Sequence, residues 1–369
     1  MSLIEQFSII EDPRSHINQK HDLLDILFLT VSAVVSGAEG WSDIEYFGIN
    51  KLSWLRQYRE FKHGIPVDDT IARIIRAINP EQFNQAFINW VNEVRSDNGH
   101  EQIAIDGKTL RHSYGEDHHS ALHSITAWSK SAGLVLAQSK SQGKKNENQS
   151  VLEMLDMLNI KGSLISADAM NTQKKICKKI ISKQADYVLC VKSNHKKLKD
   201  EISSYFHKVT RDTPDWIACY EEVDSGHGRI ETRRYRQLMN NEWINEAKAW
   251  SGIQSVIEVT RERQFKNKAT QQEILYYISS LPVNPERIAT AIRSHWEVEN
   301  KVHWVLDVTF KEDDSRIRVG DGAENVGIIR RFALNLARLH PKKGSMRGKL
   351  KQAGWSDSIR KEIIFGVDA

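Results

Sequence analysis

The first hundred residues place hydrophobic positions at helical spacing. Residues 23–35 form an apolar run that is interrupted only by Asp25, which predicts a buried helix. Residues 68–77 begin with two aspartates, as helices often do, and predict another. Asn79-Pro80 predicts the start of a further helix, because Asn caps helices and Pro is favoured in the first turn. We therefore expect a helical domain over residues 1–98.

The pattern changes to short strands after a Ser-Asp-Asn-Gly break at residues 96–99. The turn-like segment 130–133 predicts a hairpin between the second and third strands. The resulting order β-β-β-α-β-α-β, with compact connections, is typical of one α/β layer structure over residues 99–211. Apolar runs predict strands at 102–105, 123–129, 134–139, 163–166 and 187–191, and helices at 148–158 and 172–183.

Residues 212–283 differ again and predict a β-rich insertion. Four strand-like runs lie at 216–222, 230–238, 255–263 and 273–279. Asn284-Pro285 then predicts the start of a long helix that reaches about Asp307. The last region, 284–369, also contains a helical pattern near 325–339 and a basic end.

The composition is that of an ordinary globular protein, with 40% hydrophobic and 27% charged residues in a chain of 369. The longest apolar run has only 13 residues, which is too short to span a bilayer, and the N-terminus lacks the features of a signal peptide. The three cysteines have neither disulfide-framework nor zinc spacing. We therefore expect a cytoplasmic protein with no membrane contact. No glycine-rich phosphate loop is present, so we also expect no nucleotide cofactor.

Charge is distributed unevenly along the chain. Residues 1–100 contain 9 basic and 14 acidic side chains, whereas residues 170–211 contain 11 basic and 3 acidic ones. Residues 326–351 contain 8 basic side chains and no acidic one. A basic body behind an acidic N-terminal part indicates a polyanionic partner, although lysine-rich helix faces also occur simply as solvated surface.

Two aspartates follow predicted strands. Asp106 ends the first strand and Asp168 the fourth, and ligands of open α/β sheets collect at the carboxyl ends of strands. If these strands are neighbours, the two carboxylates face each other and require a proton or a cation between them. Oxygen ligands of this kind suit Mg²⁺. Taken singly, each Asp is also a common turn or cap residue.

The third acid comes from the long helix. With 100° per residue, Glu299 falls in the apolar stripe, where an unpaired carboxylate costs several kcal/mol. Glu297 falls on the opposite face, between two basic side chains at helical spacing, as in a surface ion-pair ladder. We therefore choose Glu299 as the functional acid. The alternative is a buried ion pair between Glu299 and His295 or His303.

Seven segments match, in order, the motifs of a known family. They are EDPR (11–14), HGIPVDDT (63–70), IAIDGKTLR (103–111), SADAMNTQKK (166–175), YVLCVKSN (187–194), HGRIETR (227–233) and RSHWEVENKVHWVLDVTFKEDDSRIR (293–318). With them the chain resembles the H-repeat-associated transposases, which are DDE insertion-sequence transposases. The resemblance implies a ribonuclease-H-like core, a mixed five-stranded sheet flanked by helices, interrupted by the β-rich insertion. It also implies Asp106, Asp168 and Glu299 as the catalytic, metal-binding triad.

The resemblance further implies DNA cleavage and strand transfer with two Mg²⁺ ions, for which Mn²⁺ is a possible substitute. The expected partners are double-stranded DNA, as transposon ends and target, and further copies of the chain in a dimer or larger assembly. A nuclease that cuts without joining and an inactive DNA-binding remnant stay open as alternatives. Related transposases often carry Tyr, Arg and Lys around the helix glutamate, where this chain has Ile292, His295 and Leu306.

Several further side chains are candidates for holding DNA. Basic residues on phosphates position DNA without reading its sequence, and each is equally compatible with solvated surface. His295 takes the place of the family's Arg, and Trp296 either stacks on a base or fills the core. The basic candidates are Lys108, Arg111, Lys192, Arg229 and Arg233.

Two groups of residues stay outside this assignment. The histidines at 112, 118, 119 and 123 have no cysteine nearby and are interpreted as loop residues rather than as a metal site. The acidic N-terminal domain is expected to serve assembly or recognition of transposon ends.

Overall fold

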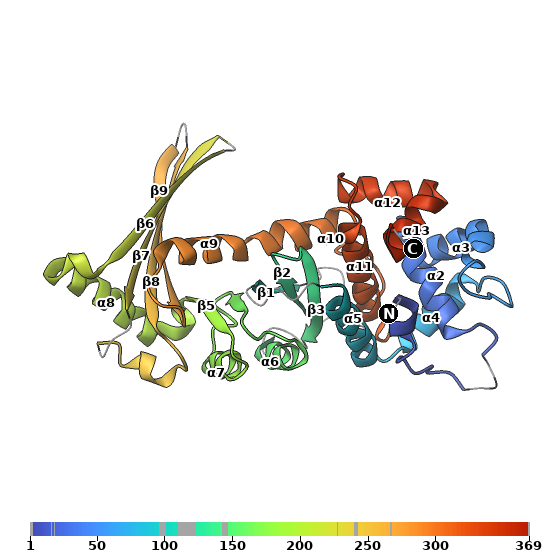
Figure 1. Ribbon diagram of the computed structural model, residues 1–369, viewed down its shortest axis with the longest axis horizontal. Helices are drawn as coiled ribbons and strands as arrows, with labels where there is room; N and C mark the ends of the chain where they lie inside the picture. The colour runs from blue at the N-terminus through green and yellow to red at the C-terminus, as the bar shows by residue number, and fades with distance from the viewer. Residues whose placement is uncertain are drawn as a thin grey trace.

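The computed structural model describes residues 3–15, 17, 19–95, 101–109, 123–141, 147–226, 228–239, 243–265 and 268–367. The molecule is elongated, with a helical body at one end, a sheet in the middle and the strands of the insertion at the other end (Figure 1). Both chain termini lie at the helical end. The break expected at residues 96–99 lies outside the described residues.

The N-terminal region is helical, as predicted. Its helices are α1 (Leu3–Phe7), α2 (Leu23–Val35), α3 (Trp41–Leu55), α4 (Asp68–Ala77) and α5 (Pro80–Val94). The α2 helix has the predicted bounds and is buried on almost every side. Asn79 caps α5, because its side chain accepts hydrogen bonds from the amides of Glu81 and Gln82. Local capping and periodicity were therefore sufficient to find α2, α4 and α5, whereas α1 was not predicted.

The C-terminal helices complete this helical body. The α11 helix (Gly322–Leu339) packs against α2, α4 and α5, although some 230 to 300 residues separate it from them in the sequence. The α12 (Met346–Trp355) and α13 (Asp357–Phe365) helices pack on α2 and α11. Part of the basic block at 326–351 is consequently turned inward: Arg330 and Arg331 are buried, whereas Lys342, Lys343, Arg347 and Lys351 are exposed.

The central strands are β1 (Gln102–Thr109), β2 (His123–Ser129), β3 (Leu134–Ser141), β4 (Leu164–Ala167) and β5 (Asp186–Val191). They lie side by side in the order β3-β2-β1-β4-β5. The first three pair antiparallel, while β1, β4 and β5 are parallel. Helices α6 (Glu147–Met157) and α7 (Lys174–Ser182) connect them and lie together below the sheet in Figure 1.

The insertion does not form a separate sheet. Its strands are β6 (Ala218–Gly226), β7 (Arg229–Met239), β8 (Ser255–Phe265) and β9 (Lys268–Ser279), all antiparallel, and they follow α8 (Lys196–Asp212). The β9 strand pairs antiparallel with β5, so one mixed sheet of nine strands runs through the molecule. The expectation of a sheet limited to five strands is thus corrected. The sequence gives no sign of this pairing, which joins segments about ninety residues apart.

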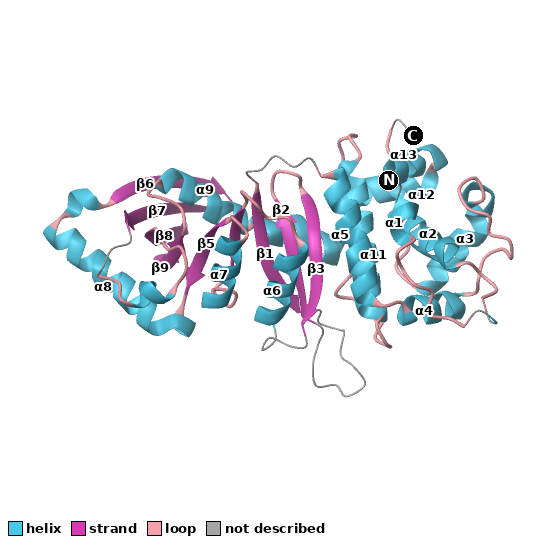
Figure 2. Cartoon of the chain, turned by 60° about the horizontal axis from the view of Figure 1, so that its bottom comes forward, coloured by secondary structure: helices cyan, strands magenta, loops and turns pink. Residues whose placement is uncertain are grey.

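The two faces of the sheet have separate cores. On β5, Tyr187, Leu189 and Val191 pack in the cluster that includes α6 and α7. Val188 and Cys190 point the other way and pack with α9 (Pro285–His295) and the strands of the insertion. Figure 2 shows helices on both sides of the strands. The sheet is therefore covered on both faces at the point where α9 crosses it.

The long helix predicted over 284–307 is not one continuous α-helix. The α9 helix ends at His295, and a π-helical turn, η6 (Glu299–His303), precedes α10 (Trp304–Val308). Short 3₁₀ turns lie at η3 (Ser193–His195), η4 (Pro214–Trp216) and η5 (Glu246–Ala249). Among the helices in the described ranges, none is long and apolar enough to cross a membrane.

Candidate active site

Strand pairing places the two aspartates at neighbouring positions. The parallel β1 and β4 strands are in register with Ile105 opposite Ala167. Asp106 and Asp168 are the residues that follow this pair in the sequence. Asp168 follows the last residue of β4, as predicted. Asp106 does not end its strand, because β1 continues to Thr109 along β2. Asp106 nevertheless has no pairing partner on β4, because β4 ends at Ala167, the residue opposite Ile105.

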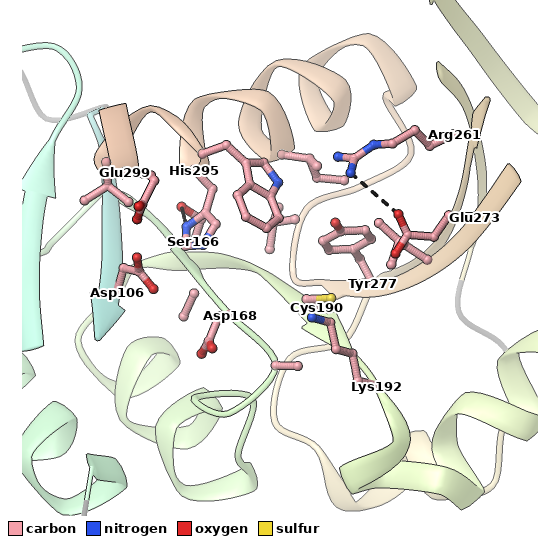
Figure 3. A pocket seen from close by; sticks show the side chains of 17 residues that line it. Asp106, Ser166, Asp168, Cys190, Lys192, Arg261, Glu273, Tyr277, His295 and Glu299 are labelled. Carbon is pink, nitrogen blue, oxygen red and sulfur yellow. Dashed lines mark hydrogen bonds and ion pairs between the residues drawn. The ribbon is translucent and has the colours of Figure 1, made fainter. Parts of the chain in front are cut away.

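A cavity of about 240 Å³ opens at this edge of the sheet (Figure 3). It lies between the ends of β1, β4 and β5, the helix that carries Glu299, and the strands of the insertion. Six of the residues singled out from the sequence line it: Asp106, Asp168, Lys192, His295, Trp296 and Glu299. These residues come from four distant segments, and the fold brings them to one place.

Asp106 and Glu299 meet at one end of the cavity, together with His303. One donor atom from each of the three residues lies within 4.8 Å of the others. The Nδ1 atom of His303 is 3.1 Å from Glu299 Oε2 and 3.5 Å from Asp106 Oδ2. The pair between Glu299 and His303 is one that the sequence left open as an alternative. In the structure it coexists with the approach of Glu299 to Asp106.

Glu299 does not face the core, which corrects the helical-wheel argument. Its side chain is 64% exposed, whereas that of His303 is 3% exposed. Trp296, for which core packing was one interpretation, is 51% exposed. The helix is irregular here, because α9 ends at His295 and a π-helical turn begins at Glu299, so the uniform 100° step on which the wheel depends does not hold. Such turns often occur at functional sites, because they redirect side chains out of the regular stripe.

Asp168 is held by its own loop. Its Oδ1 atom accepts hydrogen bonds from the amides of Met170 and Asn171, at 3.1 and 3.2 Å, and from Asn171 Nδ2, at 3.0 Å. Figure 3 shows its carboxylate turned away from Asp106 and Glu299. The structure thus gathers two of the three acids closely and places the third on the same cavity, with one oxygen already occupied.

A buried chain of hydrogen bonds continues behind Asp168. Asn171 also donates to Glu147 Oε1 over 2.7 Å, and Glu147 Oε2 lies 3.0 Å from His123 Nε2. His123 is the first residue of β2, as the strand predicted at 123–129 requires, which corrects its interpretation as a loop residue. Histidines 112, 118 and 119 lie outside the described residues. Gly107 passes so close that a Cβ there would lie 2.5 Å from His123 Nε2.

Sequence reasoning missed Glu147 and Asn171. Asn171 stands three residues after Asp168, a spacing typical of polar turns that bond their own backbone, so a local signal for it existed. Glu147 had none, because only the packing of α6 against β2 brings it there.

The carboxylates of the site differ in their affinity for protons. Burial raises the pKa of Asp106 to about 6, with His303 opposing the shift and the charges of Asp168 and Glu299 adding to it. Burial also raises the pKa of Asp168. The hydrogen bond from His303 lowers the pKa of Glu299. Asp106 and Asp168 thus both resist ionisation, as is expected of neighbouring carboxylates where a cation belongs between them.

The donor atoms fit a divalent cation. Carboxylate oxygens are the ligands preferred by Mg²⁺ and Mn²⁺, and three carboxylates line the cavity. Asp106 and Glu299 are close enough to share one ion. These residues can therefore hold a divalent metal beside β1, at one end of the cavity.

The predicted basic residues have different environments. Lys108 is only 11% exposed and pairs with the carboxylates of Asp307, Glu312 and Asp313, so it is not free to hold a phosphate. Lys192 is exposed at the edge of the cavity, where it was predicted. Arg111 lies outside the described residues.

Arg229 and Arg233 lie on one face of β7, as predicted, but only Arg229 reaches solvent. Its side chain is 42% exposed, while that of Arg233 is 8% exposed and pairs with Glu231 at 2.7 Å. His295 is enclosed: burial lowers its pKa to about 4, and its Nδ1 is 3.3 Å from Ser166 Oγ. A partly buried imidazole with a lowered pKa carries less positive charge than the family's arginine, which weakens it as a phosphate contact.

Carboxylates at neighbouring strand ends, faced by a helix glutamate, are the arrangement of metal-dependent phosphoryl-transfer enzymes. Residues 97–336 match the family described as "Transposase DDE domain", and residues 4–91 match the DDE_Tnp_1-associated region. The chain belongs to the family of DDE transposases, and the resemblance found in its motifs is thereby confirmed.

Two relatives are similar over almost the whole chain. The "H repeat-associated putative transposase YhhI" of Escherichia coli (strain K12) is 40% identical, with 99% of this chain and 98% of the relative covered. The "Putative transposase YncI" of Escherichia coli O157:H7 is 40% identical, with 98% and 94% covered. Among solved structures, a piggyBac transposase synaptic complex with hairpin DNA aligns with a TM-score of 0.45 and 11% identity, over 100% of this chain and 82% of that one.

Proposed function

We propose that this protein is an active DDE transposase that cleaves transposon ends and joins them to target DNA, with Asp106, Asp168 and Glu299 as its metal-binding triad. The observation that carries the proposal is the convergence of these three acids on one cavity, from β1, the end of β4 and a helix more than 130 residues further on. The strand order β3-β2-β1-β4-β5 supports a ribonuclease-H-like core.

The expected cofactor is Mg²⁺ as two ions, with Mn²⁺ as a substitute. When bound, such ions activate a water or a 3′-hydroxyl for attack on a phosphodiester and stabilise the leaving oxygen. Asp106 and Glu299 bind on one side of the cavity, while Asp168 offers its free oxygen on the other. The protein's own contribution is to hold these groups and the DNA backbone in place, which accounts for most of the catalysis of phosphoryl transfer.

The proposed path of the DNA runs from this cavity over the insertion. A second hollow of about 480 Å³ borders the first and shares Arg261 and Trp296 with it. Five arginines and two glutamates line it, which leaves an excess of positive charge: Arg229, Arg233, Arg261, Arg263 and Arg293, with Glu231 and Glu297. Exposed arginines on such a surface suit a phosphate backbone. Trp296 stands between the two hollows, where an exposed indole can stack on a base.

The remaining parts receive roles by position. Lys108 and Arg233 are assigned to holding the site together, because each is buried against carboxylates. We propose four regions, at 1–98, 99–211, 212–283 and 284–369, of which the first serves assembly or recognition of transposon ends. Joining two ends requires at least two active sites, so a dimer or larger assembly on DNA is part of the proposal.

The test is a strand-transfer assay with Mg²⁺ and DNA that carries the element's own ends. Joined products support a transposase, cleavage without joining a nuclease, and a mobility shift without cleavage an inactive remnant. Asp106→Asn, Asp168→Asn and Glu299→Gln should each reduce cleavage below about 1% of wild type while leaving DNA binding intact.

Glu297→Gln is the matched control for the helix acid. Glu297 lies two residues before Glu299 and pairs with Lys130 at 3.3 Å, outside the acidic cluster. It should retain cleavage close to wild type. A dead Glu297→Gln together with an active Glu299→Gln would refute the assignment of the triad.

A further inference from the structure

Among the described residues, His303 is the histidine that contacts both Asp106 and Glu299. It belongs to the buried side of the π-helical turn, with 3% of its side chain exposed, four residues after Glu299. Its Nδ1 atom points at Glu299 Oε2 and Asp106 Oδ2, at 3.1 and 3.5 Å. Either this imidazole is itself a metal ligand, or it fixes the carboxylate that is.

The second ring nitrogen separates these two roles. His303 Nε2 is buried and has no hydrogen-bond partner among the described residues. Histidines that bind metals almost always donate their other N–H to a carboxylate, carbonyl or water, which fixes the ring for ligation. Nothing in the described part of the chain does this for His303. A ring with its proton on Nδ1 instead places the N–H where the acceptors are and leaves the buried Nε2 without a partner.

Glu299 needs such a partner. With 64% of its side chain exposed, its carboxylate would otherwise sample many rotamers, since glutamate has among the largest rotamer freedom to lose on ordering. Lys108, the nearest lysine in the sequence to Asp106, is occupied by Asp307 and its acidic neighbours. Among the described side chains, the hydrogen bond from His303 is the contact that directs Glu299 toward Asp106.

We infer that His303 is a positioning residue of the metal site: its Nδ1–H holds the Glu299 carboxylate beside Asp106, and the ring itself does not bind the metal. The inference rests on the proposed function, because it assigns a role within the metal site proposed there. The inference gives the π-helical turn a role. Within this turn Glu299 is exposed to solvent, whereas His303, four residues later, is buried against Asp106.

The experiment measures Mn²⁺ binding to the full-length protein by electron paramagnetic resonance, with Asp106→Asn, His303→Leu and His303→Asn as variants. Asn carries an amide nitrogen close to the place of Nδ1 and can donate the same hydrogen bond. His303→Leu should weaken Mn²⁺ binding about tenfold or more, as loss of an outer-shell partner does, and His303→Asn should restore most of the affinity. A residue needed only for folding would not be rescued in this way.

Pulsed measurements of the same Mn²⁺-loaded protein test the ring directly. We expect no directly coordinated ¹⁴N in the wild type; a strong nitrogen coupling that disappears in His303→Asn would show a ligand and overturn the inference. His295→Gln is the matched control, because its imidazole lines the cavity but lies against Ser166 and not against the two acids. It should leave the Mn²⁺ affinity and the nitrogen spectrum unchanged.

The outcomes for the inference and for the proposed metal site are distinct. If Asp106→Asn loses Mn²⁺ while His303→Leu binds it like the wild type, the metal site stands and the role of His303 is refuted. If Asp106→Asn binds Mn²⁺ as well as the wild type, or the wild type binds none, the proposed metal site itself fails and the inference falls with it.

Discussion

Asn171 holds Asp168 through its side-chain amide, whose Nδ2 donates to Asp168 Oδ1 at 3.0 Å. The same nitrogen donates to Glu147 at 2.7 Å, so a fully buried amide joins a cavity-lining carboxylate to one in the core. Asn171→Ala should therefore remove one of the three hydrogen bonds to Asp168 Oδ1, loosening this carboxylate, and leave Glu147 without this donor. We expect cleavage to slow by about 10–100-fold, the usual cost of losing an outer-shell partner of a metal site.

Gln173→Ala is the control for this prediction. Gln173 lies two residues further on, and its side chain donates to the carbonyl of Met170, outside the buried chain of hydrogen bonds. Single-turnover cleavage at saturating Mg²⁺, together with a thermal melt, separates an effect on Asp168 from a loss of folded protein. Equal rates for Asn171→Ala and the wild type would exclude a positioning role for Asn171.

The parts of this site that depend on local sequence were predictable, and those that depend on distant pairing were not. Apolar runs and turn signals place Asp106 and Asp168 after predicted strands, but that the two strands are neighbours was only a condition of the prediction, which the parallel pairing of β1 and β4 meets. The exposure of Glu299 was missed because the helical wheel assumes a uniform 3.6-residue turn and the chain forms a π-helical one. The burial of Lys108 depends on acids about two hundred residues away, which no local pattern reveals.

Removing the charge of Asp106 should stabilise the metal-free protein. Its pKa is raised to about 6 by burial, against an ordinary value near 4 in the unfolded chain. Between these values the folded state binds more protons than the unfolded state, so stability falls as pH rises from about 4 to about 6 and stays reduced above it. Asp106→Asn should therefore gain on the order of 2 kcal/mol at pH 7.5, and little near pH 4.

Urea unfolding in a chelator, at pH 4.5 and pH 7.5, measures this effect. Asp314→Asn, at an aspartate whose side chain is 70% exposed, is the control and should change stability little at either pH. A destabilised Asp106→Asn at pH 7.5 would show that the carboxylate is favourably placed without metal, contrary to its burial beside two other acids.

The DNA surface is open to a salt titration. Lys192 is exposed at the edge of the cavity, and the Arg229 side chain is 42% exposed in the neighbouring hollow. If each contacts one phosphate, Lys192→Gln and Arg229→Gln should each lower the affinity for duplex DNA and reduce the slope of log K against log salt by about 1. Fluorescence anisotropy between low and moderate salt measures both quantities.

Lys351→Gln, on α12 in the helical body, is the control and should leave the slope unchanged. Slopes that stay at the wild-type value in all three variants would remove Lys192 and Arg229 from the interface.

Glu312 links the active-site strand to the helical body. Its carboxylate is fully buried and accepts from Arg331 Nη1 over 2.7 Å, while Lys108 lies 3.7 Å away. Burial alone would raise the pKa of Glu312, but Arg331 and Lys108 outweigh it, and the net shift is downward. Glu312→Gln leaves Arg331 buried without its counter-charge, so we expect a loss of about 3–5 kcal/mol in the free energy of unfolding. Lys311→Gln, at the preceding and largely exposed residue, should cost far less.

Because the wild-type carboxylate has a lowered pKa, the difference in the free energy of unfolding between Glu312→Gln and the wild type should shrink as pH falls through that pKa. A variant that unfolds at the same urea concentration as the wild type at neutral pH would mean that this buried pair does not hold the strand of Asp106 to α11.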